Sequence, residues 1–374
     1  MPEDTRSTDW GALEDTAPLS QKLDYLLQSL RAHGMAVERL AVVVYDPPFE
    51  TLKTFLSAGD DPPTLSNYQA RLADLPSLQA LVTQRQVRVI DDMKDSPTEH
   101  SRHLLAAGFH SSYTLPIFHE DQFFGFIFCN SRVRGFFTLA VVGQLEPILR
   151  LFALIVIDEL RAVNTLEAAT ATARYITSHR DCETGAHLGR MASYSQLIAH
   201  ALAETLDLSD EYIEYLFLFA PLHDLGKIAI PDSILLKPAP LTVEEYDLMK
   251  SHTVKGRDMV EFLIHEFHLS HLTHIDVLRN IVLSHHEAYD GSGYPEGLSG
   301  EAIPLAARIV TTADVLDALA SQRPYKPAWP LDIALAELKR LAGKQLDPQC
   351  VGALVARRDE IEAIARQYQE TVYG

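Results

Sequence analysis

Histidines and carboxylates that could bind metal ions gather in the second half of this 374-residue chain, where eleven of the sixteen histidines lie between His179 and His286. Five histidines and three carboxylates form the candidate set: Glu183, His187, His223, Asp224, His252, His285, His286 and Asp314. Eight such ligands exceed the four of a structural zinc site, and imidazole and carboxylate without thiolate favour manganese, iron or a similar metal. Two metals about 3.5–4 Å apart can clamp both oxygens of a phosphoryl displacement and lower the pKa of bound water. The set therefore predicts hydrolysis of a phosphodiester with two or three metals.

The spacing within each segment supports this prediction only in part. Glu183 and His187 are four residues apart, so they share one face of a helix. An adjacent histidine and aspartate at 223–224 offer one imidazole and one carboxylate to neighbouring metals. Each fragment alone is weak, because adjacent histidines often form a solvated helix end and Asp314 could be a cap or a buried hydrogen-bonding group. Their order and their number along the chain make the metal site the better interpretation.

These ordered segments resemble the HD-GYP domain of cyclic di-GMP phosphodiesterases, a branch of the HD metal-dependent phosphohydrolases. The resemblance covers about residues 165–350 and rests on HDLGK at 223–227, HHE at 285–287 and GYP at 293–295. The resemblance implies an all-helical fold and hydrolysis of cyclic di-GMP to linear pGpG, with further cleavage to GMP left open. The sequence departs from the family at 237–242, where KPAPLT replaces KPGKLT and one cation is lost.

The resemblance also implies metal ligands. Six residues match ligand positions, with Asp224 bridging two metals: His223, Asp224, His252, His285, His286 and Asp314. Glu183 and His187 match two further positions, and a glutamate at the first of them accompanies a third metal in the family. Iron is the metal that the resemblance favours, with manganese as the alternative.

Four residues match positions that contact substrate in the family. Lys227 is implied to contact the scissile phosphate and to protonate the leaving oxygen. Arg323 and Lys326 are implied to hold the phosphates and guanine edges, and Tyr294 to face the substrate.

The segments that must position this site are predicted to be helical from about residue 165 to the C-terminus. Helical patterns lie at 211–219, 243–251, 332–341 and 359–368, and no strand alternation competes with them. We therefore expect an all-α HD-domain bundle over residues 179–374.

The N-terminal part predicts a separate α+β domain over residues 18–147, after a polar tail at 1–17. Strands are expected at 40–45, 51–57, 87–90, 112–118 and 123–129, with helices at 20–33 and 76–84. Residues 111–131, followed by 136–149, resemble the closing hairpin and final helix of a GAF domain, which implies a sensor with an unknown small ligand.

A connecting helix is predicted over residues 148–178, because 148–184 contains no glycine or proline. A continuous helix over that stretch would be about 55 Å long. Leu149, Phe152 and Val156 begin an approximate a/d stripe that continues to Val163 and Leu166. The stripe either packs on the chain's own domains or pairs with a second copy in a homodimer.

Composition excludes several classes of protein. The net charge of −19 repels phosphate backbones, so we expect no DNA or RNA partner. Three scattered cysteines do not predict a disulfide framework, and no apolar run was expected to approach the ~18–20 residues of a membrane span. These features predict a cytoplasmic protein without a membrane partner. Two other functions stay open: hydrolysis of another nucleotide, and a cyclic-dinucleotide-binding module that recruits a signalling protein through its GYP face.

Overall fold

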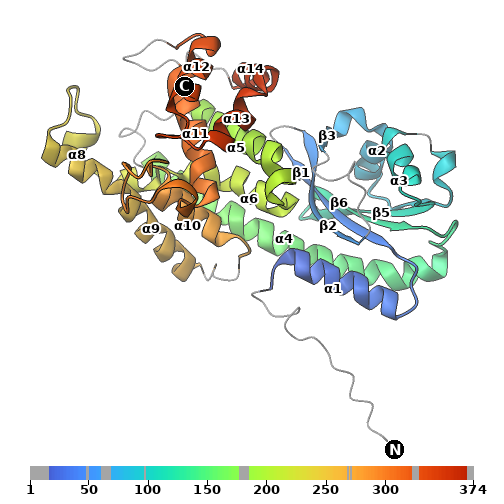
Figure 1. The fold of residues 1–374 in the computed structure, drawn as a ribbon. Helices are drawn as coiled ribbons and strands as arrows, with labels where there is room; N and C mark the ends of the chain where they lie inside the picture. Colours follow the sequence, from blue (N-terminus) through green and yellow to red (C-terminus); the bar gives the residue numbers. More distant parts are fainter. Residues whose placement is uncertain are drawn as a thin grey trace, which may run out of the picture. The chain divides into compact units, whose positions relative to one another are not determined.

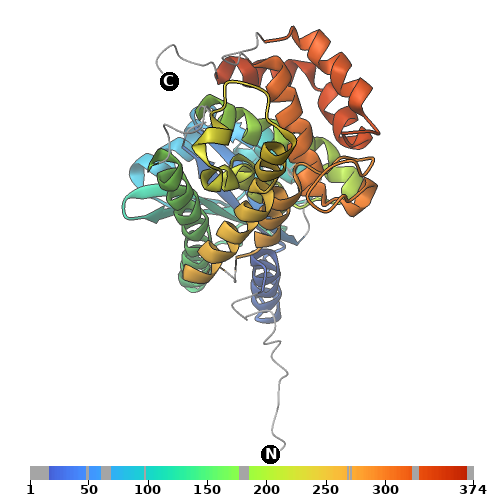
Figure 2. The same ribbon diagram turned by 90° about the vertical axis from the view of Figure 1, so that its left-hand side faces the viewer.

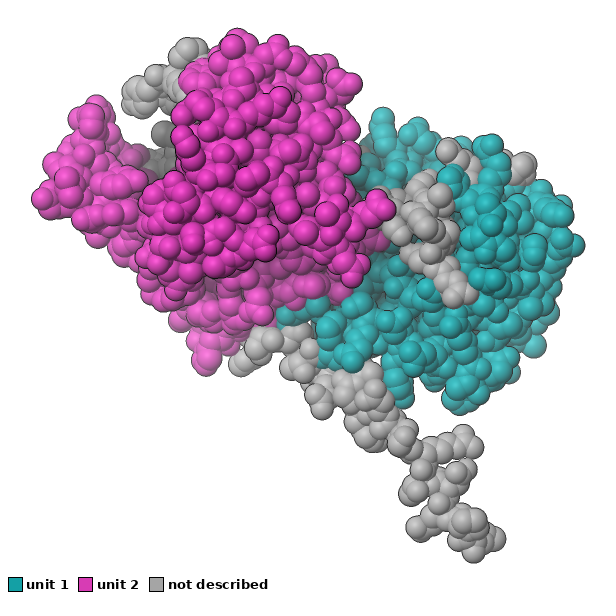
Figure 3. All heavy atoms as spheres, in the orientation of Figure 1, with its two compact units in different colours: residues 1–162, 271–273 teal, residues 163–270, 274–374 magenta. Residues whose placement is uncertain are grey.

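The computed structural model describes residues 17–47, 50–59, 69–96, 98–176, 185–267, 269, 272–321 and 328–368. The chain divides into two compact units (Figure 3), residues 1–162 with 271–273 and residues 163–270 with 274–374. The predicted polar tail lies outside the described residues, apart from Ala17.

The first unit is built on a six-stranded sheet in the order β3-β2-β1-β6-β5-β4, and every neighbouring pair is antiparallel. The strands are β1 (Arg39–Asp46), β2 (Thr51–Gly59), β3 (Gln69–Arg71), β4 (Arg88–Ile90), β5 (Ser111–His119) and β6 (Gln122–Ser131). Apolar and β-branched residues fill the central strands, which favours a pleated, buried sheet. The predicted strands are confirmed, whereas the short edge strand β3 was not expected.

Helices cover both faces of this sheet (Figure 1). On one side lie α1 (Leu19–Ala32) and α4 (Leu139–Ile176), and on the other α2 (Pro76–Gln84) and α3 (Glu99–Ala106), with short 3₁₀ turns η3 (Leu72–Asp74) and η4 (Met93–Asp95). Ala41 and Phe128 pack with Leu78 of α2 in one core cluster. The α+β character of this unit is therefore confirmed.

Helix α4 differs from the predicted connecting helix in two ways. It begins at Leu139 instead of residue 148 and continues through Pro147. Leu149, Phe152 and Val156 are buried within the chain itself, so this part of the predicted stripe is not available to a second copy. The segment Leu139–Ala162 is also long and apolar enough to cross a membrane by length and composition alone, which corrects the expectation that no run approaches that length. Only a third of its most apolar window is buried.

The regular elements in the described part of the second unit are helices, as predicted, apart from one isolated β-bridge between Ala342 and Leu346. Its helices are α5 (Gly185–Leu206), α6 (Asp210–Phe219), η5 (Ala220–Leu222), η6 (Leu225–Ala229), α7 (Asp232–Leu235), α8 (Val243–Lys250), α9 (His252–Glu266), α10 (Ile275–Ser284), η8 (Gly300–Ala302), α11 (Leu305–Ala320), α12 (Leu331–Leu341), α13 (Pro348–Val355) and α14 (Arg358–Gln367). Helix α10 packs against α9 and α11, and α11 packs against α5 (Figures 1 and 2). These four helices bring segments far apart in the sequence to one place.

Candidate metal centre

The second unit brings seven of the eight predicted ligands together in two groups. One group contains Asp224, His252, His285 and His286, and the other contains His187, His223 and Asp314. Within each group the candidate ligand atoms lie within 4.8 Å of one another. The neighbours His223 and Asp224 belong to different groups, so the two groups adjoin. Glu183 lies outside the described residues.

Each described candidate ligand sits at or near the end of a helical segment, except for Asp314 in the interior of α11. His223 and Asp224 lie between η5 and η6, His252 is the first residue of α9, and His285 follows the end of α10. Side chains at helix ends can project into the space that several helices enclose. The site is thus formed by five segments that only the tertiary fold brings together.

A glycine allows the closest of these approaches. A Cβ atom on Gly226 would lie 1.8 Å from the carbonyl oxygen of His252 and 2.6 Å from the nitrogen of Gly256. Both contacts are with backbone, so no side chain larger than hydrogen fits there. The absence of a Cβ at Gly226 lets η6 pack directly on α9, and this contact places Asp224 beside His252.

Three of the imidazoles are oriented by the chain's own carbonyl groups. The Nδ1 atoms of His223, His252 and His285 lie 2.9, 2.7 and 2.9 Å from the carbonyl oxygens of residues 220, 249 and 281. A carbonyl oxygen only accepts a hydrogen bond, so each Nδ1 carries the proton and donates it. In the neutral ring, Nε2 then presents a lone pair, which is the form that binds a metal. Burial lowers the pKa of His285 and, well below its usual value, that of His286, which favours the neutral ring.

The Asp224 carboxylate lies between the two groups. Its Oδ1 is 3.2 Å from Nε2 of His252 and 3.6 Å from Nε2 of His285, while its Oδ2 is 3.2 Å from Nε2 of His223. Burial alone would raise the pKa of Asp224, but the neighbouring Lys227 and His223 hold it well below its usual range. Oδ1 is buried and accepts no hydrogen bond in the described part of the chain. A buried carboxylate oxygen facing bare imidazole nitrogens fits a metal ion that would satisfy all of them.

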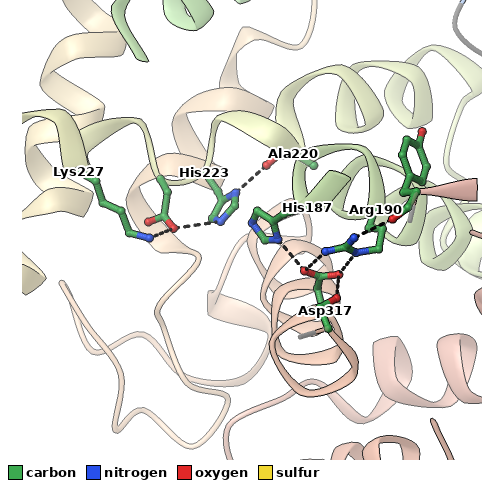
Figure 4. Close-up of polar contacts among 9 residues, drawn as sticks. His187, Arg190, Ala220, His223, Lys227 and Asp317 are labelled. Carbon is green, nitrogen blue, oxygen red and sulfur yellow. Dashed lines mark hydrogen bonds and ion pairs between the residues drawn. The ribbon is translucent and has the colours of Figure 1, made fainter. Parts of the chain in front are cut away.

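His187 is oriented by a second aspartate, which the sequence analysis did not single out (Figure 4). Its Nδ1 donates to Oδ2 of Asp317 at 2.7 Å, and Nε of Arg190 donates to Oδ1 of Asp317 at 2.5 Å. Burial would raise the pKa of Asp317, but these two partners outweigh it and lower the pKa to about 2. A carboxylate that accepts the Nδ1 proton fixes the ring and makes Nε2 a better ligand. The spacing in the sequence could have indicated both residues. Asp317 follows Asp314 by three residues and Arg190 follows His187 by three, so each lies on the same helix face as a candidate ligand.

Replacing Asp317 with asparagine should weaken metal retention or activity about 10- to 100-fold, the usual effect of losing such an outer partner. Asparagine keeps one oxygen and places a donating amide nitrogen where the other oxygen accepts, so either the hydrogen bond from His187 or that from Nε of Arg190 is lost. Metal affinity by competition with a chelator would measure the effect, with a urea midpoint of the metal-free protein to check folding. Ser321→Ala is the matched control, because its hydroxyl donates to the same carboxylate at 2.9 Å while carrying no charge. Unchanged affinity in the asparagine variant would show that Asp317 only supports the helix packing.

Two predicted substrate residues lie beside the ligands. Nζ of Lys227 is 2.6 Å from Oδ2 of Asp224. The ring of Tyr294 stacks on that of His286, with centroids 4.9 Å apart and an interplanar angle of 28°. Arg323 and Lys326 lie outside the described residues.

The loop that carries Tyr294 is held by a buried carboxylate that the sequence analysis also missed. Glu287 accepts hydrogen bonds from the backbone nitrogens of Glu296 at 2.7 Å and Leu298 at 3.0 Å. A Cβ on Gly293 would lie 2.2 Å from the backbone nitrogen of Ala288, so this loop folds tightly onto the segment that follows the two histidines. Glu287 and Gly293 thus fix the position of Tyr294 relative to His286.

Comparison with known proteins identifies the family of this part of the chain. The HD domain family matches residues 164–350, which is half of the chain. The chain belongs to the HD domain family. The two groups of candidate ligands described above lie within this HD domain.

Curated relatives also match about half of the chain. The cyclic di-GMP phosphodiesterase response regulator RpfG of Xanthomonas campestris is 48% identical over 202 residues, which cover 54% of this chain and 50% of that protein. A cyclic di-GMP phosphodiesterase of Vibrio cholerae is 43% identical over 211 residues, covering 55% and 42%. The chain thus spans about half the length of the curated relatives that it matches.

Among solved structures, a GAF domain/HD domain protein from Geobacter sulfurreducens is 20% identical and gives a TM-score of 0.32, covering 37% of this chain and 93% of that one.

Proposed function

We propose that this HD-domain protein is a metal-dependent phosphodiesterase that hydrolyses cyclic di-GMP to pGpG, with further cleavage to GMP left open. The observation that carries the proposal is the pair of adjoining ligand groups joined at His223 and Asp224. Three curated relatives that are 39–48% identical over the matched region are named cyclic di-GMP phosphodiesterases, which supports this substrate.

The ligand set suits two or three divalent metals. His252, His285 and His286 would hold one metal with Asp224, and His187, His223 and Asp314 would hold a second, so Asp224 and His223 link the two positions. Glu183 is proposed to add a third position. Iron is the proposed metal and manganese the alternative. When bound, such metals would offset phosphate charge and lower the pKa of the attacking water.

Lys227 is proposed to bind the scissile phosphate and donate a proton to the leaving 3′-oxygen. Its ammonium group lies 2.6 Å from Oδ2 of Asp224, and its side chain keeps 24% of its surface exposed. The carboxylate favours the protonated amine, so the group has a proton to give and an exposed side from which a ligand can reach it. Lys227 would thereby bring one of the few positive charges to a substrate that meets a chain of net charge −19.

Tyr294, Arg323 and Lys326 are proposed to complete the substrate site. The ring of Tyr294 extends the stacked surface of His286, which would suit the flat face of a guanine base. Arg323 and Lys326 would bind phosphate and guanine edges.

The first unit is proposed to act as a GAF-like sensor for a small ligand in a cytoplasmic homodimer. The apolar residues of α4 that are exposed would form the dimer face: Ile148, Leu151, Leu154 and Ile155, with exposures of 37 to 65%. A signalling partner would dock on the loop of Gly293, Tyr294 and Pro295.

A second candidate substrate is a hybrid cyclic dinucleotide. One curated relative, a 3′3′-cGAMP-specific phosphodiesterase of Vibrio cholerae, is 38% identical over 185 residues. Competition between the two dinucleotides in one reaction would rank them.

The test is metal content and cyclic di-GMP turnover measured on the same anaerobically purified sample. About three metals per chain with pGpG formation would support the full proposal, and about two would remove the Glu183 position. Lys227→Met should lower the catalytic rate about 100-fold while leaving the metal content unchanged, because the loss of one general acid typically costs 10²–10⁴-fold. Full metal loading without turnover of either dinucleotide would overturn the proposed activity and favour a binding module.

A further inference from the structure

The first unit contains a cavity that the proposed chemistry of the second unit does not use. Its volume is about 230 Å³, and it lies between the sheet and the segments that carry α2 and α3. Most of its wall is apolar, as at Leu52, Leu78 and Phe128. Basic side chains line it as well, among them Arg39, Arg88 and His100. An apolar cavity with a few convergent polar groups has the composition of a small-molecule site.

The register of the sheet places one of these basic residues on the cavity face. Ala41 pairs with Phe128 across β1 and β6, Phe128 pairs with Thr114 across β6 and β5, and Thr114 pairs with Arg88 of β4. Residues paired directly across neighbouring strands point to the same face. Arg88 therefore continues the row formed by Ala41, Phe128 and Thr114, on the side of the sheet that α2 covers.

The guanidinium of Arg88 has hydroxyl partners and no carboxylate partner in the described residues. Nη1 donates to Oγ of Ser77 at 3.0 Å, and Nη2 donates to Oγ1 of Thr114 at 3.2 Å. Nε is buried and has no acceptor in that same part of the chain. Asp74 also lines the cavity, but it forms no ion pair with Arg88 there. A half-buried guanidinium whose buried Nε donor is unused favours a ligand that brings an acceptor and a negative charge.

The neighbouring His100 is neutral, so it neither balances the charge of Arg88 nor adds a positive charge of its own. Burial, followed by the positive charges of Arg39 and Arg88, lowers the pKa of His100 to about 4. His100 is therefore neutral near pH 7, and both guanidiniums act on it across the cavity. Arg39 donates to Oδ1 of Asn130 at 3.1 Å, which fixes one of its nitrogens on the sheet.

We propose that this cavity binds a small organic carboxylate, with the carboxylate on Arg88 and an apolar body against Leu78 and Phe128. The positive charge of Arg88 matches one negative charge, and its planar guanidinium matches a carboxylate. The cavity is smaller than the ~300–1,000 Å³ of sites for drug-sized ligands, so a cyclic dinucleotide does not fit it. The idea that this ligand regulates the second unit rests on the proposed phosphodiesterase activity. Binding of the ligand does not rest on it, because binding can be measured without turnover.

The test uses fluorine NMR of 4-fluorobenzoate, 4-fluorobenzamide and 4-fluorophenyl phosphate with the full metal-loaded chain. We expect 4-fluorobenzoate to bind at one site per chain, and the amide and the phosphate to bind at least tenfold more weakly. Arg88→Met should weaken binding of the carboxylate at least tenfold. Arg85→Met is the control, because Arg85 is an exposed arginine of the same unit that pairs with Asp121 at 2.7 Å.

The proposal would be overturned if the carboxylate did not bind, or if Arg88→Met bound it as well as the wild type. It would also be overturned if the amide bound as well as the carboxylate, or if the phosphate bound more tightly. If that variant loses its near-ultraviolet circular dichroism, Arg88→Lys replaces it. Lysine keeps the charge but loses the planar fork, so the same tenfold loss is expected and unchanged affinity contradicts the proposal. These results are independent of whether cyclic di-GMP is hydrolysed.

Discussion

Replacing Asp224 with asparagine is expected to reduce the proposed cyclic di-GMP turnover by about 10³-fold or more and to lower the content of the proposed metals. The two carboxylate oxygens face different ligand groups, with Oδ1 towards His252 and Oδ2 towards His223. Asparagine has nearly the same volume but only one oxygen, and its amide nitrogen is a donor that cannot bind a cation. One of the two proposed metal positions would therefore lose its shared ligand. Loss of several kcal/mol of transition-state stabilisation corresponds to this fall in rate.

The measurement is a single-turnover assay with elemental analysis of the same sample. Asp276→Asn is the matched control, since it makes the same chemical change at an exposed aspartate of α10 that pairs with Arg279. The control should keep full metal content and full rate. Wild-type turnover in the Asp224 variant with its metals retained would show that this carboxylate does not join the two positions.

Replacing Gly226 with alanine is expected to destabilise the second unit by about 3 kcal/mol and to disturb the metal site at the same time. The added Cβ would lie 1.8 Å from a backbone oxygen of His252, and neither backbone can rotate away as a side chain could. Overpacking of this kind costs about 1–3 kcal/mol or more. The displacement would separate Asp224 from His252, so metal affinity should fall with stability.

Urea denaturation with and without added metal measures both effects. Gly352→Ala is the control, because nothing lies within 4 Å of the Cβ it would add and it sits inside α13, where alanine is favoured over glycine. The control should be neutral or slightly stabilising. If Gly226→Ala unfolds at the wild-type urea concentration, the close contact of η6 with α9 is not a constraint on the site.

Local sequence patterns predicted those helices and strands whose limits are set by neighbouring residues in the sequence. Helix α2 begins at Pro76 and ends at Gln84 as expected, because proline suits a first turn. Helix α4 was predicted to begin too late because proline was treated as a boundary, whereas Pro147 lies within the helix. Helix α3 was not expected, since its short segment has few apolar residues to show a period.

The residues of the candidate site also fall into those that the sequence predicted and those that it did not. The described ligands could be named from residue type, order and family resemblance, and the structure brings them together. The contact between Asp317 and Arg190 was not predicted because it joins residues 127 apart in the sequence. Their three-residue spacing from Asp314 and His187 places each on the helix face of a candidate ligand but does not report that they contact each other. The role of the buried Glu287 was not predicted for a different reason. Its hydrogen-bond partners are backbone nitrogens, which residues of almost any type would supply.

The assembly of the ligands from five separate segments has a consequence for the lifetime of the protein in a cell. Metals bound there would tie α5 to α9, α10 and α11, and ligands that bind only the folded state stabilise it, by about 2.7 kcal/mol at a hundredfold excess over the dissociation constant. Proteases degrade chains that open, and a change of this size alters how often a domain opens. The amount of the protein would then follow the supply of metal, so that scarcity would remove the chain itself as well as its activity.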